Sequence, residues 1–81
     1  MADNFTIGRA IARLRKAMRL TQQSLAERLY VSHQAVSKWE HGDALPDIMT
    51  LYRMCRYFGV SIEQLITNDT SAREKELALA N

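Results

Sequence analysis

The stretch TQQSLAERLYVSHQAVSKWEHG, residues 21–42, constrains the fold more than any other part of the chain. Its apolar residues recur at helical spacing in two short runs, Leu25, Ala26 and Leu29, and then Val36 and Trp39. Thr21 and Ser32 precede these runs, where side chains that cap a helix belong. The pattern predicts helices at about 22–29 and about 33–40, joined by a tight turn.

The outward face of the second of these helices is polar and has no packing role in the pattern. His33 and Ser37 lie four residues apart on this face, and Gln34 and Lys38 lie beside them at the same spacing. A helix that presents such side chains fits the major groove of DNA. Glutamine can pair with adenine, lysine can donate to guanine or phosphate, and histidine can donate to guanine. We therefore predict that the residues that read bases are His33, Gln34, Ser37 and Lys38.

This stretch strongly resembles the helix-turn-helix of phage Cro and repressor proteins, often called the XRE family. The matching residues are Thr21, Gln22, Leu25, Ala26, Val31, Ser32, Ala35, Val36, Ser37, Trp39, Glu40 and Gly42. The resemblance extends from about Ile7 to Ile66 and implies five helices in register. It also implies a transcriptional regulator, typically a repressor, that binds specific sequences in double-stranded DNA.

The resemblance assigns roles to further residues. It places Gln22, at the start of the first predicted helix of the motif, on a backbone phosphate, and Ser32 could add a phosphate contact to its capping role. It pairs Arg15 with Glu40, which would fix the orientation of the reading helix. Tyr30 departs from the family pattern, where glycine is common, so either its ring packs locally or the turn differs slightly.

Helical spacing continues outside the motif. Ile7, Ile11, Leu14 and Met18 mark a first helix at about 5–18, and a capping box at Ser61 and Gln64 begins a short helix near the end of the pattern. A helix at about 47–57, ended by Gly59, is expected to bury Ile48, Leu51, Tyr52, Cys55 and Phe58. No segment reads as a strand, so the predicted fold class is all-α, a compact five-helix bundle.

Residues 69–81 differ from the rest, because they are polar and carry Leu77 and Leu79 as their only large apolar groups. We predict a DNA-binding domain over 1–68, followed by this tail. Two interpretations of the tail are open: a frayed end or the start of a linker, or a sixth helix that docks on the domain or on a second subunit.

Charge and cysteine content narrow the class of protein. Residues 1–20 carry five basic residues against one acidic residue, although the whole chain has a net charge of only +2. This excess suits either a solvated face or a phosphate contact. Cys55 is the single cysteine, so it forms no intramolecular disulfide and a reducing compartment fits. No segment resembles a signal peptide or a bilayer span, so we expect a cytoplasmic protein without a membrane partner.

Other functions find less support in the sequence. His33 and His41 stand two turns apart with no third metal ligand at a useful spacing, so we expect no metal site, no cofactor and no enzyme activity.

Because one module reads few base pairs, a homodimer on palindromic half-sites is expected. Its interface is predicted at the fifth helix and the tail, from Ile62, Leu65 and Ile66. The alternative is a protein-interaction module, such as an antitoxin or a regulator that binds a partner protein.

Overall fold

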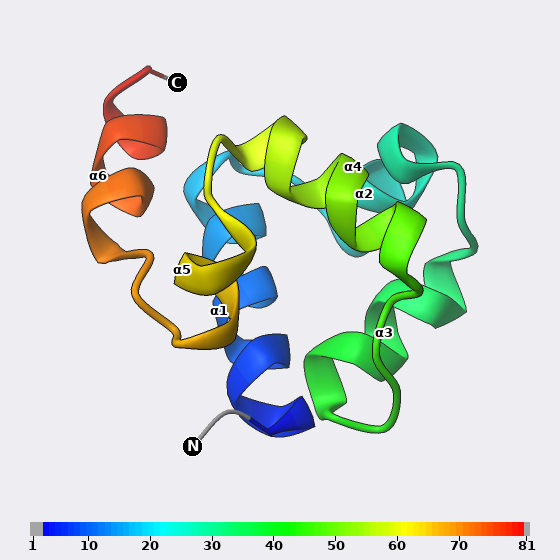
Figure 1. Ribbon diagram of the computed structural model, residues 1–81. Coiled ribbons are helices and arrows are strands. Elements are labelled where there is room, and N and C mark those ends of the chain that lie inside the picture. The colour runs from blue at the N-terminus through cyan, green and yellow to red at the C-terminus, as the bar shows by residue number, and fades with distance from the viewer. Residues whose placement is uncertain (1–2, 81) are drawn as a thin grey trace.

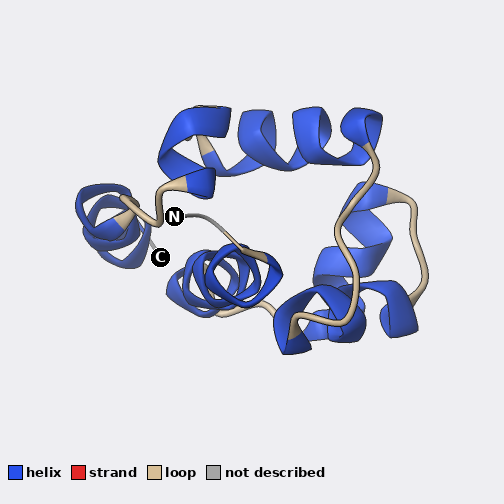
Figure 2. Ribbon diagram, turned by 60° about the horizontal axis from the view of Figure 1, so that its bottom comes forward, coloured by secondary structure: helices blue, strands red, loops and turns tan. Residues whose placement is uncertain are grey.

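The computed structural model describes residues 3–80 and contains six helices and no strand over that range (Figures 1 and 2). The helices are α1 (Asn4–Ala17), α2 (Gln22–Leu29), α3 (His33–His41), α4 (Ile48–Phe58), α5 (Ile62–Ile66) and α6 (Ser71–Ala80). The all-α class is therefore confirmed, with one helix more than the five predicted. Within residues 3–80, no helix combines the length and apolar character that crossing a membrane requires.

Side-chain caps explain where the first five helices begin. In each case an oxygen of the residue before the helix accepts a hydrogen bond from a backbone N–H three residues later. These capping residues are Asp3, Thr21, Ser32, Asp47 and Ser61. Ser61 and Gln64 form the complete capping box that the sequence predicts. Gly42 and Gly59 end α3 and α4 in the left-handed conformation, at φ values of 79° and 72°.

The Asp47 cap predicts how stability depends on pH. Hydrogen bonds from Thr50 lower the pKa of Asp47 below its usual value of 3.8. The capping carboxylate therefore stabilises the fold above that value, and the contribution is lost as the pH falls through the lowered pKa. Asparagine at position 47 still caps the helix but does not titrate. We therefore expect the thermal midpoint of Asp47→Asn to fall less than that of wild type when the pH is lowered from about 5 to about 2. Asp43→Asn, which removes an exposed carboxylate that caps no helix, is the control. Identical pH profiles for wild type and Asp47→Asn would contradict the prediction.

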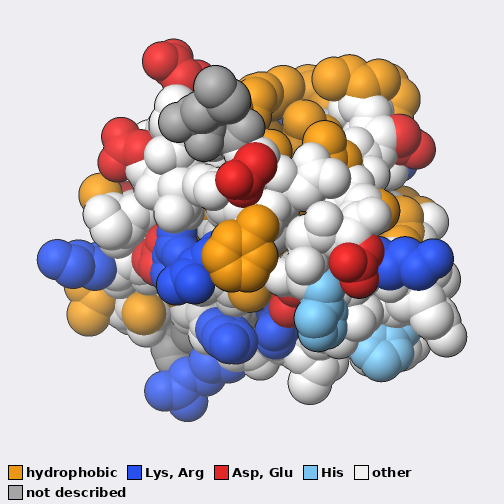
Figure 3. Space-filling view, turned by 90° about the horizontal axis from the view of Figure 1, so that it is seen from below, with side chains coloured by type: hydrophobic (Ala, Val, Ile, Leu, Met, Phe, Trp, Pro, Cys, Tyr) orange, Lys and Arg blue, Asp and Glu red, His pale blue; other side chains and the backbone are white. Residues whose placement is uncertain are grey.

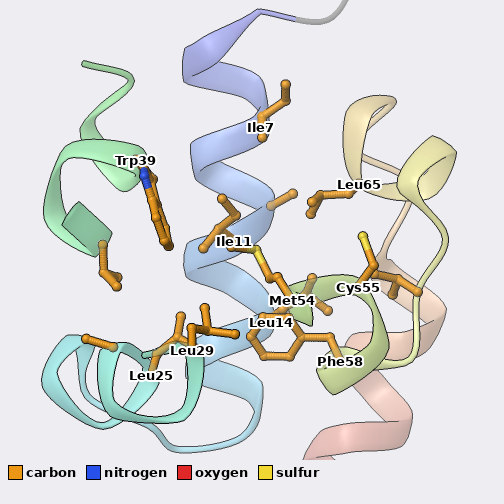
Figure 4. Packing of buried hydrophobic residues seen from close by; sticks show 14 of the residues in the cluster. Ile7, Ile11, Leu14, Leu25, Leu29, Trp39, Met54, Cys55, Phe58 and Leu65 are labelled. Carbon is orange, nitrogen blue, oxygen red and sulfur yellow. The ribbon is translucent and has the colours of Figure 1, made fainter. Parts of the chain in front are cut away.

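The hydrophobic core lies between α1 and the helices that surround it. Figure 4 shows Ile11 and Leu14 of α1 directed toward Met54 and Phe58 of α4, with Leu29 of α2 close by. These five side chains are at most 1% exposed. α1 also contacts α3, α5 and α6, while α2 packs on α3 and α4. The central position of α1 means that a change in its packing is transmitted to most of the domain.

The buried face of α4 differs from the predicted one. Ile48 and Tyr52 are 68% and 49% exposed, so their placement in the core was wrong. The side chains that α4 buries are instead those of Thr50, Met54, Cys55 and Phe58. Apolar residues occur on nearly every side of this helix, so helical spacing alone did not select a face. Contacts with α2 and α5 selected it.

The segment after α5 forms a helix that lies against α1 (Figure 1). Thr70, just before α6, is 1% exposed, and its hydroxyl donates to Glu74 at 2.6 Å. Glu74 also pairs with Arg13 of α1 at 3.3 Å, and Arg73 donates to the carbonyl oxygen of Phe58 at 2.7 Å. Of the two interpretations of the tail, the docked helix is the one observed.

Candidate nucleic-acid interface

The position of α3 depends on a close approach to α1 at Gly8. Gly8 is buried, and a Cβ atom added there would overlap the carbonyl oxygen of Trp39 and lie 3.1 Å from its carbonyl carbon. The inward side chains Val36 and Trp39 are 0% and 5% exposed, as the sequence predicts for Trp39. The backbone contact and these two side chains fix the distance between α3 and α1.

An ion pair fixes the same two helices laterally. Arg15 of α1 donates from Nε to Glu40 Oε2 at 2.7 Å and from Nη2 to Glu40 Oε1 at 2.9 Å. The two side chains are only 12% and 7% exposed. Arg15 also donates from Nη1 to the carbonyl oxygen of Leu20 at 2.8 Å. The pair that the resemblance implies is thus present, bidentate and largely shielded from water, so each charge depends on the other.

The network continues from Glu40 to the start of α3. Gln22, the first residue of α2, donates from Nε2 to Glu40 Oε1 at 3.0 Å. The other end of the Gln22 amide, Oε1, lies 3.0 Å from His33 Nε2. Four side chains of three helices therefore form one hydrogen-bonded series, Arg15, Glu40, Gln22 and His33.

The residues predicted to read bases differ in how free they are. His33, Gln34 and Lys38 are exposed, and no other described residue hydrogen-bonds or pairs with the side chains of Gln34 and Lys38. Ser37 is partly buried, and its hydroxyl lies 3.5 Å from His41 Nδ1. The structure thus leaves Gln34 and Lys38 open to a ligand, holds His33 by one nitrogen, and places Ser37 in a less accessible position.

The chain matches the sequence model of the helix-turn-helix family over residues 11–65. This chain is an XRE-type helix-turn-helix protein. It is 41% identical over 59 residues to the HTH-type transcriptional activator BcrR of Enterococcus faecalis. These aligned residues are 73% of this chain and 29% of BcrR. It is 37% identical over 82 residues to the HTH-type transcriptional regulator DicA of Escherichia coli, covering 95% of this chain and 61% of DicA. An uncharacterised HTH-type transcriptional regulator of Sinorhizobium fredii, y4dJ, is 38% identical over 61 residues, which are 75% of this chain and 79% of y4dJ. This helix-turn-helix chain therefore spans less than two thirds of the length of BcrR and of DicA.

Tyr30 and Ser32 have different roles in the turn between α2 and α3. Ser32 Oγ accepts a hydrogen bond from the Ala35 N–H at 3.1 Å, which leaves its hydroxyl proton available. Tyr30 takes the left-handed conformation at φ 60°, which favours glycine over other residues. Its side chain is 86% exposed, so the suggestion that the ring packs locally is wrong. The Val31 N–H donates to the Ala26 carbonyl at 3.0 Å, and this backbone bond closes the turn without the ring.

The basic residues of α1 and of the turn after it are partly committed to contacts within the chain. Arg15 and Arg13 pair with Glu40 and Glu74, and the Arg9 guanidinium lies 5.5 Å from the centre of the Phe5 ring. Lys16 and Arg19 remain exposed. Figure 3 shows both histidines of the chain on one face, with several lysine and arginine side chains close to them. Part of the charge excess of residues 1–20 thus pairs with acidic side chains and stabilises the fold.

Sequence reasoning missed two features of the helix-turn-helix site. The first is Gly8, whose close contact with Trp39 nothing in the local pattern indicates. The second is the double role of Gln22, because its bonds to Glu40 and His33 join residues 18 and 11 positions apart. Both features arise from the crossing of helices, which spacing within one helix does not report.

Two kinds of reactive group, possible metal ligands and the Cys55 thiol, bear on the chemistry of this domain. Among residues 3–80, no three histidine, cysteine, aspartate or glutamate side chains are grouped so that they could hold a metal ion. Cys55 is 6% exposed in the core of the helix-turn-helix domain. Burial raises the pKa of its thiol, which disfavours the reactive thiolate.

Proposed function

We propose that this chain is a sequence-specific reader of double-stranded DNA that regulates transcription, as a homodimeric repressor on palindromic sites. The observation that supports this most is the polar face of α3, where His33, Gln34 and Lys38 are exposed while Val36 and Trp39 anchor the opposite face. A major groove admits such a helix, and each exposed side chain matches a base edge or a phosphate. The family and its named regulators agree with this function. We propose the cytoplasm as its compartment.

Phosphate contacts are proposed at Gln22 and Ser32, which flank the reading face. The Gln22 amide nitrogen carries two protons, and its bond to Glu40 uses one of them. The Ser32 hydroxyl proton is likewise not used by the cap. Both residues stand at helix N-termini, where backbone N–H groups favour an anion.

The dimer is proposed on geometric grounds, since two modules about one DNA turn apart read enough base pairs for specificity. The interface predicted at the fifth helix needs one correction. Leu65 is 0% exposed in the core of its own domain and is not available to a partner, whereas Ile62 is 37% exposed. We therefore propose that the contact involves Ile62 of α5 together with α6.

Selection from a pool of randomised duplex DNA tests the function. We expect a palindromic consensus, and binding to it should weaken with salt at a log–log slope of about −0.9 per neutralised phosphate. A reporter gene with the selected site over its promoter should then lose expression when the protein is present. No enrichment, or binding only at a Kd of about 10⁻⁴–10⁻⁶ M, would contradict a sequence reader.

The base-reading role of Gln34 gives a separate prediction. Because Gln34 is exposed and unpaired among the described residues, Gln34→Ala should remove a base contact without disturbing the fold. We expect the discrimination at one base pair of each half-site to fall by about 1–3 kcal/mol. Gln23→Ala, an exposed glutamine of α2, is the matched control and should keep the wild-type preference at that position. An unchanged selection profile for Gln34→Ala would exclude Gln34 from base reading.

A protein-interaction module is the second candidate, and one observation favours it. Leu45, Ile48, Met49 and Tyr52, around the start of α4, are 49% to 68% exposed. Grouped exposed apolar side chains are typical of surfaces that bind another protein. DNA binding that is absent or insensitive to salt would favour this function over the first.

A further inference from the structure

We propose that Glu40 and Gln22 hold the proton of His33 on Nε2, so that His33 Nδ1 accepts a hydrogen bond from a base amino group in DNA. Glu40 and Gln22 are then positioning residues, and His33 determines specificity as an acceptor. The proposal rests on the DNA-reading function proposed above, and it specifies which bases His33 prefers.

The first step is the orientation of the Gln22 amide. Glu40 receives two hydrogen bonds from Arg15 and is a carboxylate, which can only accept. The Gln22 group that lies 3.0 Å from Glu40 Oε1 must therefore be its NH₂ group. A flipped amide would bring its carbonyl oxygen against a carboxylate oxygen. The Arg15–Glu40 pair thus directs the Gln22 carbonyl oxygen toward His33.

The second step is the position of the His33 proton. His33 Nε2 lies 3.0 Å from Gln22 Oε1, which has no proton to donate. The histidine must donate, so its neutral ring carries the proton on Nε2 and a lone pair on Nδ1. His33 is exposed at the start of α3, and no other described residue bonds to Nδ1.

The third step is the matching base chemistry. In the major groove, adenine presents the N6 amino group and cytosine the N4 amino group, and both donate. Guanine O6 and N7 and thymine O4 only accept. An acceptor at Nδ1 therefore favours adenine or cytosine at the base that His33 faces. The expectation that His33 donates to guanine would require the proton on Nδ1.

The same helix contains an internal contrast at His41. His41 Nδ1 lies 2.8 Å from the carbonyl oxygen of Ser37, which only accepts. The neutral His41 ring must therefore carry its proton on Nδ1. The structure thus assigns opposite tautomers to the two histidines of the chain.

Nitrogen-15 NMR of the wild-type protein at about pH 8.5, where imidazole is neutral, tests the tautomers directly. We expect His33 to show a protonated Nε2 and His41 a protonated Nδ1. A protonated Nδ1 on His33, or the same tautomer on both rings, would overturn the proposal. This measurement needs neither a variant nor DNA.

A second arm tests the role of Gln22 in base choice. In Gln22→Leu, His33 loses its acceptor, so we expect its Nε2 proton to exchange freely with water while the His41 signal is unchanged. Preference for adenine or cytosine at the base facing His33 should fall about 3- to 10-fold, the value of one neutral hydrogen bond. Gln23→Leu is the matched control, since Gln23 lies beside Gln22 and its side chain hydrogen-bonds only Glu27 among residues 3–80.

The outcomes separate this inference from the proposed function. The expected tautomers without sequence-specific DNA binding would overturn the proposed function, and with it the reading role of His33. Specific binding that prefers guanine or thymine at this base, or an unchanged preference in Gln22→Leu, would overturn the inference and leave the function standing.

Discussion

Arg15→Met is expected to lower the free energy of unfolding by roughly 3–5 kcal/mol, the usual cost of breaking a buried ion pair. The substitution leaves the Glu40 carboxylate, 7% exposed, without the guanidinium that compensates its charge. For a domain of this size the thermal midpoint should fall by about 15 °C or more. Circular dichroism during heating or urea titration measures both quantities.

Arg13→Met is the matched control for that variant. Arg13 also pairs across helices, with Glu74, but its side chain is 36% exposed and that of Glu74 is 20% exposed. Water screens this pair, whose loss should cost about 1 kcal/mol. Arg13→Met also removes the hydrogen bond that Arg13 Nη2 donates to Asn68 Oδ1, and we expect the total loss to stay below that of Arg15→Met because no buried charge is left unpaired. Equal thermal midpoints for Arg15→Met and Arg13→Met would contradict the assigned difference.

A double variant identifies the cause of the loss. If an unpaired Glu40 is responsible, Arg15→Met combined with Glu40→Leu should recover most of the stability, because an apolar pair of similar volume replaces both charges. No recovery would show that the Arg15 contact with the Leu20 carbonyl, or lost packing, dominates instead.

Gly8→Ala is expected to destabilise the domain by on the order of 3 kcal/mol, the upper part of the range for overpacked cores. The added methyl group meets the backbone of Trp39 and Glu40, which has no rotamer to change, so α3 must move away from α1. Alanine is the better helix former by about 1 kcal/mol, and the clash must exceed that gain. Urea titration gives the size of the loss.

Trp39 reports the movement of α3 directly, because it is the only tryptophan in the chain and is 5% exposed. In folded Gly8→Ala, its fluorescence should shift to longer wavelength as water gains access. Arg9→Ala, which changes the exposed neighbour on α1, is the control and should leave the emission unchanged. A Gly8→Ala protein as stable as wild type, with unshifted emission, would exclude the close approach as a constraint.

Elements with strong local signals were predictable from the sequence. Thr21, Ser32 and Ser61 cap α2, α3 and α5 as predicted, and Gly59 ends α4 as predicted. These signals act over three or four residues, within reach of one hydrogen bond or one backbone conformation. The polar face of α3 followed from the same short-range spacing.

Features that depend on crossing helices were not predictable in the same way. The buried face of α4 was misassigned at Ile48 and Tyr52, since several faces of that helix are apolar. The docking of α6 depends on Arg73 and Glu74, two polar residues whose partners Phe58 and Arg13 lie 15 and 61 positions away in the chain. The spacing of polar residues in a sequence does not show which of them are buried. Burying a polar side chain costs desolvation energy, and only a hydrogen-bonding partner supplied by the folded structure offsets that cost.

The sequence by itself determined the first five helices of this protein, the caps at Thr21, Ser32 and Ser61 and the polar residues that α3 presents, because all of these depend on neighbours within one or two turns. Only the tertiary structure decided how tightly α3 lies on α1 at Gly8, and that Glu40 and Gln22 connect Arg15 to His33. These contacts join three helices through hydrogen bonds of about 3 Å, and such bonds form only when the packed core has fixed the helix positions.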